Sequence, residues 1–146
     1  MALDYEVTVL PAVWPGRKTA VSDRGSSRFK TIWTQAIRKL GYEIAKLRGR
    51  NVKIALDVHA KQIRDDKQLR ADARPATSSV IVSFDTDDGR LEFPCDTYAF
   101  WQANIDAIAR AMAALRLVDR YGVQSGRQYS GFKQLNAPAP EQDQYF

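Results

Sequence analysis

The chain has 146 residues, of which 45% are hydrophobic and 27% are charged, and these values are typical of one folded domain. This composition excludes a chain that is disordered throughout and a collagen, and the single cysteine excludes a disulfide-rich mini-protein. The formal net charge of +5 is unevenly distributed. Residues 17–53 contain 11 basic and 2 acidic side chains, a net +9, whereas residues 71–146 contain 7 basic and 10 acidic side chains, a net −3.

The first predicted element is a short strand over residues 5–10, where Tyr5, Val7 and Val9 alternate with polar side chains. A loop rich in Pro and Gly follows. The spacing of apolar residues at three and four then predicts a long amphipathic helix over residues 27–48. Gly49 is expected to end this helix in the left-handed conformation. The rest of the helix circumference is rich in Arg and Lys, with Glu43 as its one acid.

Alternating apolar residues predict a second strand over residues 51–58, in the segment NVKIALDV. Residues 60–77 are polar and charged and are predicted to form a long loop. A third strand over residues 79–85 and a fourth over residues 90–93 are expected to form a hairpin around Asp88-Gly89.

A second long helix, which is rich in alanine, is predicted over residues 97–121, with Asp96 or Thr97 as its N-cap. The element order is therefore β-α-β-β-β-α. The economical arrangement is a two-layer α+β sandwich, an antiparallel meander sheet with two long helices on one face. We expect residues 1–133 to form this single domain and residues 134–146 to be a flexible tail.

The concentration of basic residues predicts an anionic partner. Lys and Arg beside an apolar helix stripe can follow a phosphate backbone, because each contact releases condensed counterions. The first hypothesis is therefore a non-enzymatic protein that binds nucleic acid or a nucleoprotein complex. The predicted contact residues are Arg17, Lys18, Arg24, Arg28, Lys30, Arg38, Lys39, Lys46, Arg48, Arg50 and Lys53, with Trp14, Tyr129 and Phe132 as candidate aromatic contacts.

Two alternatives remain open from the residues. The basic surface also suits an adaptor or inhibitor that docks on an acidic protein surface, for example that of a host defence complex. Asp57 and His59, two residues apart at a strand end, suggest a metal-dependent hydrolase, although this spacing has low specificity. The order α-β-β-β-α also matches double-stranded-RNA-binding domains, but the second helix begins with acidic and aromatic residues where those domains are rich in lysine.

Segments spread from Trp14 to Phe132 resemble small proteins of actinobacterial phages, plasmids and mobile islands, some of which are labelled J-domain-like because longer relatives carry a J domain. The segments are WPGRKT (14–19), SRF (27–29), RADARP (70–75), FPCDT (93–97), WQAN (101–104), ALRLVDRYGV (114–123) and QYSGF (128–132). No His-Pro-Asp triplet is present, since His59 is followed by Ala60, so the resemblance implies no co-chaperone activity. It implies an accessory protein of a mobile element.

The expected location is the cytoplasm, because the chain has one cysteine, no signal-peptide pattern at its start and no apolar run of 18 residues. For the same reason we expect no membrane partner. No motif in the sequence indicates a cofactor.

Overall fold

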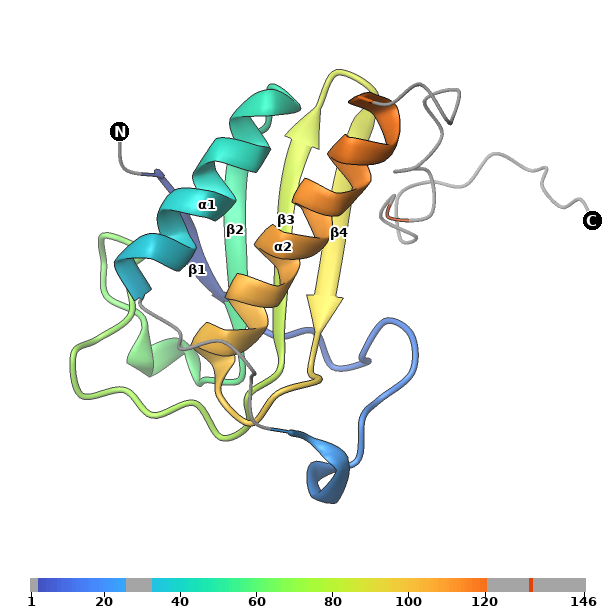
Figure 1. The fold of residues 1–146 in the computed structure, drawn as a ribbon. Coiled ribbons are helices and arrows are strands. Elements are labelled where there is room, and N and C mark those ends of the chain that lie inside the picture. Colours follow the sequence, from blue (N-terminus) through green and yellow to red (C-terminus); the bar gives the residue numbers. More distant parts are fainter. Residues whose placement is uncertain (1–2, 26–32, 121–131, 133–146) are drawn as a thin grey trace, which may run out of the picture.

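The computed structural model describes residues 3–25, 33–120 and 132. Within these residues the chain forms a four-stranded sheet with α-helices packed on one of its faces (Figure 1). The strands and α-helices are β1 Glu6–Val9, α1 Trp33–Lys46, β2 Arg50–Leu56, β3 Val80–Thr86, β4 Gly89–Cys95 and α2 Trp101–Arg120. The predicted α+β class is confirmed, and these elements follow one another in the predicted order. Their bounds and the strand directions differ in part.

The strands lie in the order β1-β2-β3-β4, and β2, β3 and β4 form the predicted antiparallel meander. The prediction of an antiparallel sheet is wrong for β1, which pairs parallel to β2. The reason is the connection: α1 carries the chain back along the sheet, so β2 starts from the same end as β1. The sheet is therefore mixed.

The core lies between the sheet and the helices. Alternate residues of β2, including Val52, Ile54 and Leu56, point toward the helices and are buried. Leu40 of α1 and Met112 of α2 are fully buried against this layer. The apolar faces that the sequence periodicity predicts for the strands and for the helices therefore pack together in one core.

The end of α1 differs from the expectation at one residue. Arg48, not Gly49, has the left-handed conformation, with φ of 55°. Gly49 is required for a different reason, since a Cβ there would lie 2.7 Å from Cδ2 of Phe84 and would also overlap Ile44. Residues 27–32 of the predicted helix lie outside the described residues.

The start of α2 is also later than predicted, at Trp101. The predicted cap Asp96 instead accepts hydrogen bonds from the backbone N–H and Oγ1 of Thr19, at 2.8 and 2.7 Å. Asn104 stabilises the turn before the helix by accepting from the N–H of Tyr98 at 2.9 Å. A long-range contact has therefore replaced the local cap.

The segment 60–77 packs along the edge of β1. The backbone N–H of Val7 donates to the carbonyl of Lys67 at 2.8 Å, and Nε2 of Gln68 donates to the carbonyl of Tyr5 at 2.7 Å. Ile63 and Leu69 form an isolated antiparallel bridge and pack against the core. This segment therefore covers a strand edge that would otherwise expose unpaired backbone groups.

In the part of the chain that the structure describes, no helix is long and apolar enough to cross a bilayer.

Candidate anion-binding surface

The fold distributes the predicted contact cations over separate surfaces. Arg38, Lys39 and Lys46 lie exposed on α1. Arg17 and Lys18 are exposed in the loop after β1, which is anchored through Thr19 near the start of α2. Arg48 is exposed at the end of α1, and Arg50 and Lys53 belong to β2. Arg28 and Lys30 lie outside the described residues.

Arg24 is placed in the interior of a polar network. Its side chain is 7% exposed, lies 3.6 Å from the carboxylate of Asp96, and donates to the hydroxyls of Ser78 and Ser79 at 3.1 and 3.3 Å. A cation held in this way links the loop before α1 to the strand-to-helix turn before α2. We therefore assign Arg24 to the fold and leave it out of the proposed contact surface.

Two of the α1 cations, Arg38 and Lys39, border a groove between α1 and α2, which we call the helix groove. It has a volume of about 400 Å³ and is lined by Arg38, Lys39, Tyr42, Glu43, Ala109, Arg110 and Ala113. Ala109 is buried and Ala113 is half-buried, so small side chains of α2 form its apolar floor. The helix groove thus combines an apolar floor with a cationic rim.

The carboxylates at the helix groove are buried and already bound. Arg116 donates to both carboxylate oxygens of Glu43. Asp106 accepts from Nε of Arg110 at 2.7 Å and lies 3.5 Å from Nζ of Lys39. Because the acids are beneath the surface and the cations are more exposed, the outer surface is predominantly positive.

Tyr42 lies among these cations and is 53% exposed. Nζ of Lys46 is 5.1 Å from the centre of its ring, and the guanidinium carbon of Arg116 is 5.5 Å from it. Both distances fall within the range of a cation–π interaction. We define the outer helix surface as six residues of α1 and α2: Arg38, Lys39, Tyr42, Lys46, Arg110 and Arg116.

The α2 part of this surface was not predicted from the sequence. Arg110 and Arg116 lie in a half of the chain that is acidic on average, which hid them from a count of charges along the sequence. At about 100° per residue, Arg116 lies at the edge of the apolar stripe of α2, whereas Arg110, six residues earlier, lies on the opposite side of the helix from this stripe. A helical-wheel analysis of α2 would therefore not have placed the two on one surface, since their shared neighbour α1 comes from the tertiary fold.

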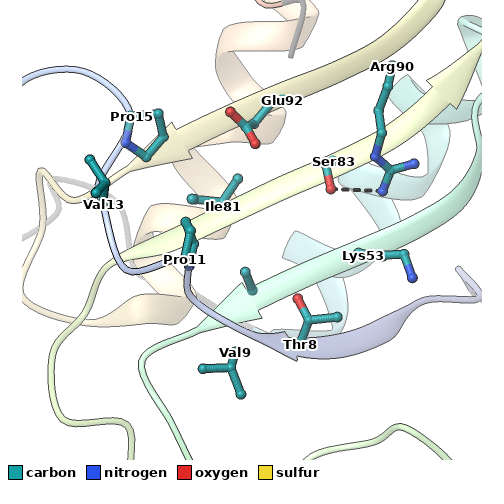
Figure 2. Close-up of a pocket in the computed structure, with 11 residues that line it drawn as sticks. Thr8, Val9, Pro11, Val13, Pro15, Lys53, Ile81, Ser83, Arg90 and Glu92 are labelled. Carbon is teal, nitrogen blue, oxygen red and sulfur yellow. Dashed lines mark hydrogen bonds between the residues drawn. The ribbon is translucent and has the colours of Figure 1, made fainter. Parts of the chain in front are cut away.

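The other face of the sheet holds a second hollow, the sheet groove. Figure 2 shows it between the loop residues Pro11, Val13 and Pro15 and the strand residues Lys53 and Arg90. Its volume is about 580 Å³, and a neighbouring cavity of about 530 Å³ shares the same two cations.

The cations of the sheet groove have acidic partners on the same surface. Lys53 lies 3.4 Å from Glu6, and Arg90 lies 2.8 Å from Asp85. Outside the groove, Arg50 similarly lies 3.2 Å from Asp87. Because carboxylates are exposed beside these cations, the sheet side is a poorer match for a polyanion than the outer helix surface.

Of the candidate aromatic contacts, Phe132 packs against the core. Its ring stacks on Phe93 with the centroids 4.5 Å apart and an interplanar angle of 24°. Trp14 is half-buried in the loop after β1, and Tyr129 lies outside the described residues. Tyr42 is an exposed aromatic residue beside the helix groove that was not predicted from the sequence.

The geometry around Asp57 and His59 gives no support to a hydrolase. Asp57 accepts a hydrogen bond from the hydroxyl of Thr77 at 2.7 Å, while His59 is exposed and its backbone N–H donates to Gln62. Across residues 3–25, 33–120 and 132, no group of three or more His, Cys, Asp or Glu side chains is arranged to hold a metal ion.

Comparison of the chain with family models, with curated proteins and with solved structures found no match.

Proposed function

We propose that this protein binds nucleic acid, without catalysis, through the outer helix surface. The observation that supports this proposal is the convergence of cations from α1 and α2 on one surface, above carboxylates that are buried and bound. Among the residues that the structure describes, five cations, Arg38, Lys39, Lys46, Arg110 and Arg116, stand here against two acids, Glu43 and Asp106. The resulting net charge of +3 is the charge that is available to bind a phosphate backbone.

This excess leads to a quantitative expectation for the salt dependence of binding. Each phosphate neutralised on duplex DNA lowers the slope of log affinity against log salt by about 0.9. Contact with about three phosphates therefore gives a slope near −2.7 on a duplex, and near −2.1 on a single strand, where the factor is about 0.7. The whole basic stretch 17–53 would give a steeper slope, so this value distinguishes the outer helix surface from a diffuse basic surface.

The setting that we propose is the cytoplasm of a bacterium, where the protein would act as an accessory factor of a mobile element. The resemblance of its segments to phage and plasmid proteins supports this setting, as does the single, unpaired Cys95. A nucleoprotein complex of the host or of the element is an equally suitable source of the phosphate backbone.

Charge-removal variants test the proposal. In fluorescence anisotropy with labelled oligonucleotides, the double variant Arg38→Gln/Lys46→Gln should weaken binding and make the salt slope shallower by about 1.8 on a duplex. The matched control is Lys61→Gln/Arg74→Gln, which removes the same charge from exposed positions in the segment 60–77. Equal effects of the two double variants, or no binding at low salt, would rule out the proposed surface.

A second candidate function is binding to an acidic segment of a partner protein. The apolar floor formed by Ala109 and Ala113 favours it, because protein interfaces combine apolar centres with charged rims. A pull-down from host lysate separates the candidates. A partner that remains bound after nuclease treatment and is lost with Arg38→Gln/Lys46→Gln supports the protein partner, while nuclease-sensitive capture supports nucleic acid.

A further inference from the structure

We propose that the helix groove selects single-stranded over double-stranded nucleic acid, by accepting an unpaired base beside Tyr42 while the surrounding cations hold the backbone. This inference rests on the proposed function and deepens it. It concerns which form of nucleic acid is bound, and it assigns Tyr42 and the alanine floor a role that the charges alone do not explain.

The chemistry of the groove floor suits a base better than a phosphate backbone. A phosphate backbone needs hydrogen-bond donors and positive charge, whereas Ala109 and Ala113 offer neither. A duplex keeps its base faces stacked inside and presents phosphates and sugars to a protein surface of this kind. A single strand can turn a base out of its own stack and place an apolar face against such a floor. The floor can therefore contact an unpaired base of a single strand, whereas it offers no favourable contact to the backbone of a duplex.

The helix groove is also large enough to hold a base. The helix groove, at about 400 Å³, falls within the range of pockets that take up small-molecule-sized groups, from about 300 to 1,000 Å³. It is also open at the surface between the helices, where Arg38 and Lys39 of α1 face Arg110 of α2 across the floor. A base that enters the groove therefore leaves its own phosphates at the cationic rim.

The exposed ring of Tyr42 offers a surface on which a base can stack. Tyr42 lines the helix groove, is 53% exposed, and has Lys46 and Arg116 near its ring. Trp33 and Trp101 in the same helices are half-buried and their rings pack against each other, whereas the ring of Tyr42 is accessible to a base. An aromatic ring with cations around it is the arrangement that single-strand-binding proteins use to stack bases beside a charged groove.

The test compares nucleic-acid forms and side chains in one titration series. Labelled oligodeoxythymidine and oligouridine of about 12 nucleotides, within the usual site sizes of single-strand binders, are measured beside a blunt duplex of the same length. We expect both single strands to bind more tightly than the duplex at the same salt concentration, with the two arms showing whether DNA or RNA is preferred. A duplex that binds as tightly as either single strand overturns the inference.

Side-chain variants then locate the base. Tyr42→Leu should weaken single-strand binding by about 5- to 150-fold with little change in salt slope, because it removes a stacking ring and no charge. Tyr42→Phe should retain most of the affinity. Phe100→Leu is the control, since it removes an aromatic residue that is 69% exposed and does not line the helix groove. Equal affinities of Tyr42→Leu and the wild-type protein overturn the inference.

A groove-filling variant provides an independent check that keeps Tyr42 in place. Ala113→Leu adds apolar volume to the half-buried groove floor and leaves every charge unchanged. It should weaken single-strand binding and leave the weaker duplex binding as it is, with circular dichroism showing the fold retained. Single-strand binding that Ala113→Leu leaves unchanged would overturn this inference while the proposed function stands, whereas the absence of binding to any oligonucleotide would remove the proposed function itself.

Discussion

Arg116 of α2 holds Glu43 of α1 in a two-point ion pair, with Nε and Nη2 donating to Oε1 and Oε2 at 2.9 and 3.0 Å. Glu43 is 5% exposed, while the Arg116 side chain is 31% exposed and also lies against Tyr42. The pair therefore joins the helices at the outer helix surface. It also explains why a helix with so many cations has a glutamate among its buried residues.

This pair predicts an asymmetric response to mutation. Arg116→Met should lower the free energy of unfolding by about 1–3 kcal/mol, because it leaves a buried carboxylate without its strongest donors. Glu43→Gln should cost less, since the amide oxygen still accepts from Arg116. In a urea-unfolding double-mutant cycle the two changes should be non-additive by about 1 kcal/mol. Additivity to within about 0.5 kcal/mol would show that the residues are not coupled.

The end of α1 predicts opposite effects at adjacent residues. Arg48→Gly should stabilise the protein by about 1 kcal/mol, because glycine adopts the left-handed conformation of this position without a Cβ penalty. Gly49→Ala should destabilise it by about 1–3 kcal/mol, since the new methyl group would overlap Ile44 and Phe84, which are both buried. Arg48→Ala is the control, as it removes the charge and keeps the Cβ. Thermal unfolding of the three variants measures these differences.

These adjacent residues illustrate what the sequence could and could not predict. Periodicity was sufficient to find the strands and helices, because spacings of two and of three to four reflect which side of an element is buried. It could not determine that Gly49 is needed for close packing on Phe84, which is 35 positions away. The parallel direction of β1 was missed for the same reason, since it depends on how α1 crosses the sheet.

The candidate site was predictable only in part. Arg38, Lys39 and Lys46 are on the surface where the helix pattern placed them, because an amphipathic helix fixes its outward residues locally. Arg24 was not separable from them by sequence, as its burial depends on Asp96 and Ser78, which are more than 50 residues away. Clustering of charge along a chain is thus a weak guide to clustering in space.

Asp85 predicts a pH-dependent contribution to stability. Hydrogen bonds from Asn51 and Arg90, at 2.8 Å each, lower the pKa of its carboxyl below the ordinary value for aspartate. A lowered folded-state pKa stabilises the protein above the ordinary value of about 3.9, and this stabilisation is lost as the pH falls through the lowered pKa.

Asp85→Asn should therefore reduce the urea midpoint at neutral pH, and the difference from the wild-type protein should shrink as the solution is acidified below about pH 4. Asp88→Asn makes the same change of charge at an exposed position in the β3–β4 turn and is the control. A difference between Asp85→Asn and wild type that stays constant down to the lowest pH would contradict the role of the carboxylate.

Cys95 at the end of β4 predicts a slowly reacting thiol. Burial raises the pKa of Cys95, and its Sγ donates to Oδ1 of Asn104 at 3.3 Å. Because the thiolate is the reacting form, a raised pKa lowers the reactive fraction at any given pH, and the surrounding atoms restrict access as well. In a thiol–disulfide exchange assay the folded protein should react more slowly than N-acetylcysteine near pH 8, and the rise of its rate should be displaced to higher pH.

Two comparisons separate burial from an intrinsic property of this segment. Addition of urea to unfold the chain should bring the rate of Cys95 up to that of the free thiol. Asn104→Ala should accelerate the reaction without denaturant, since Asn104 is fully buried and its Nδ2 joins α2 to the carbonyls of Ser78 and Tyr98. A folded wild-type protein that reacts as fast as N-acetylcysteine would contradict the protection of the half-buried Cys95 thiol by its surroundings.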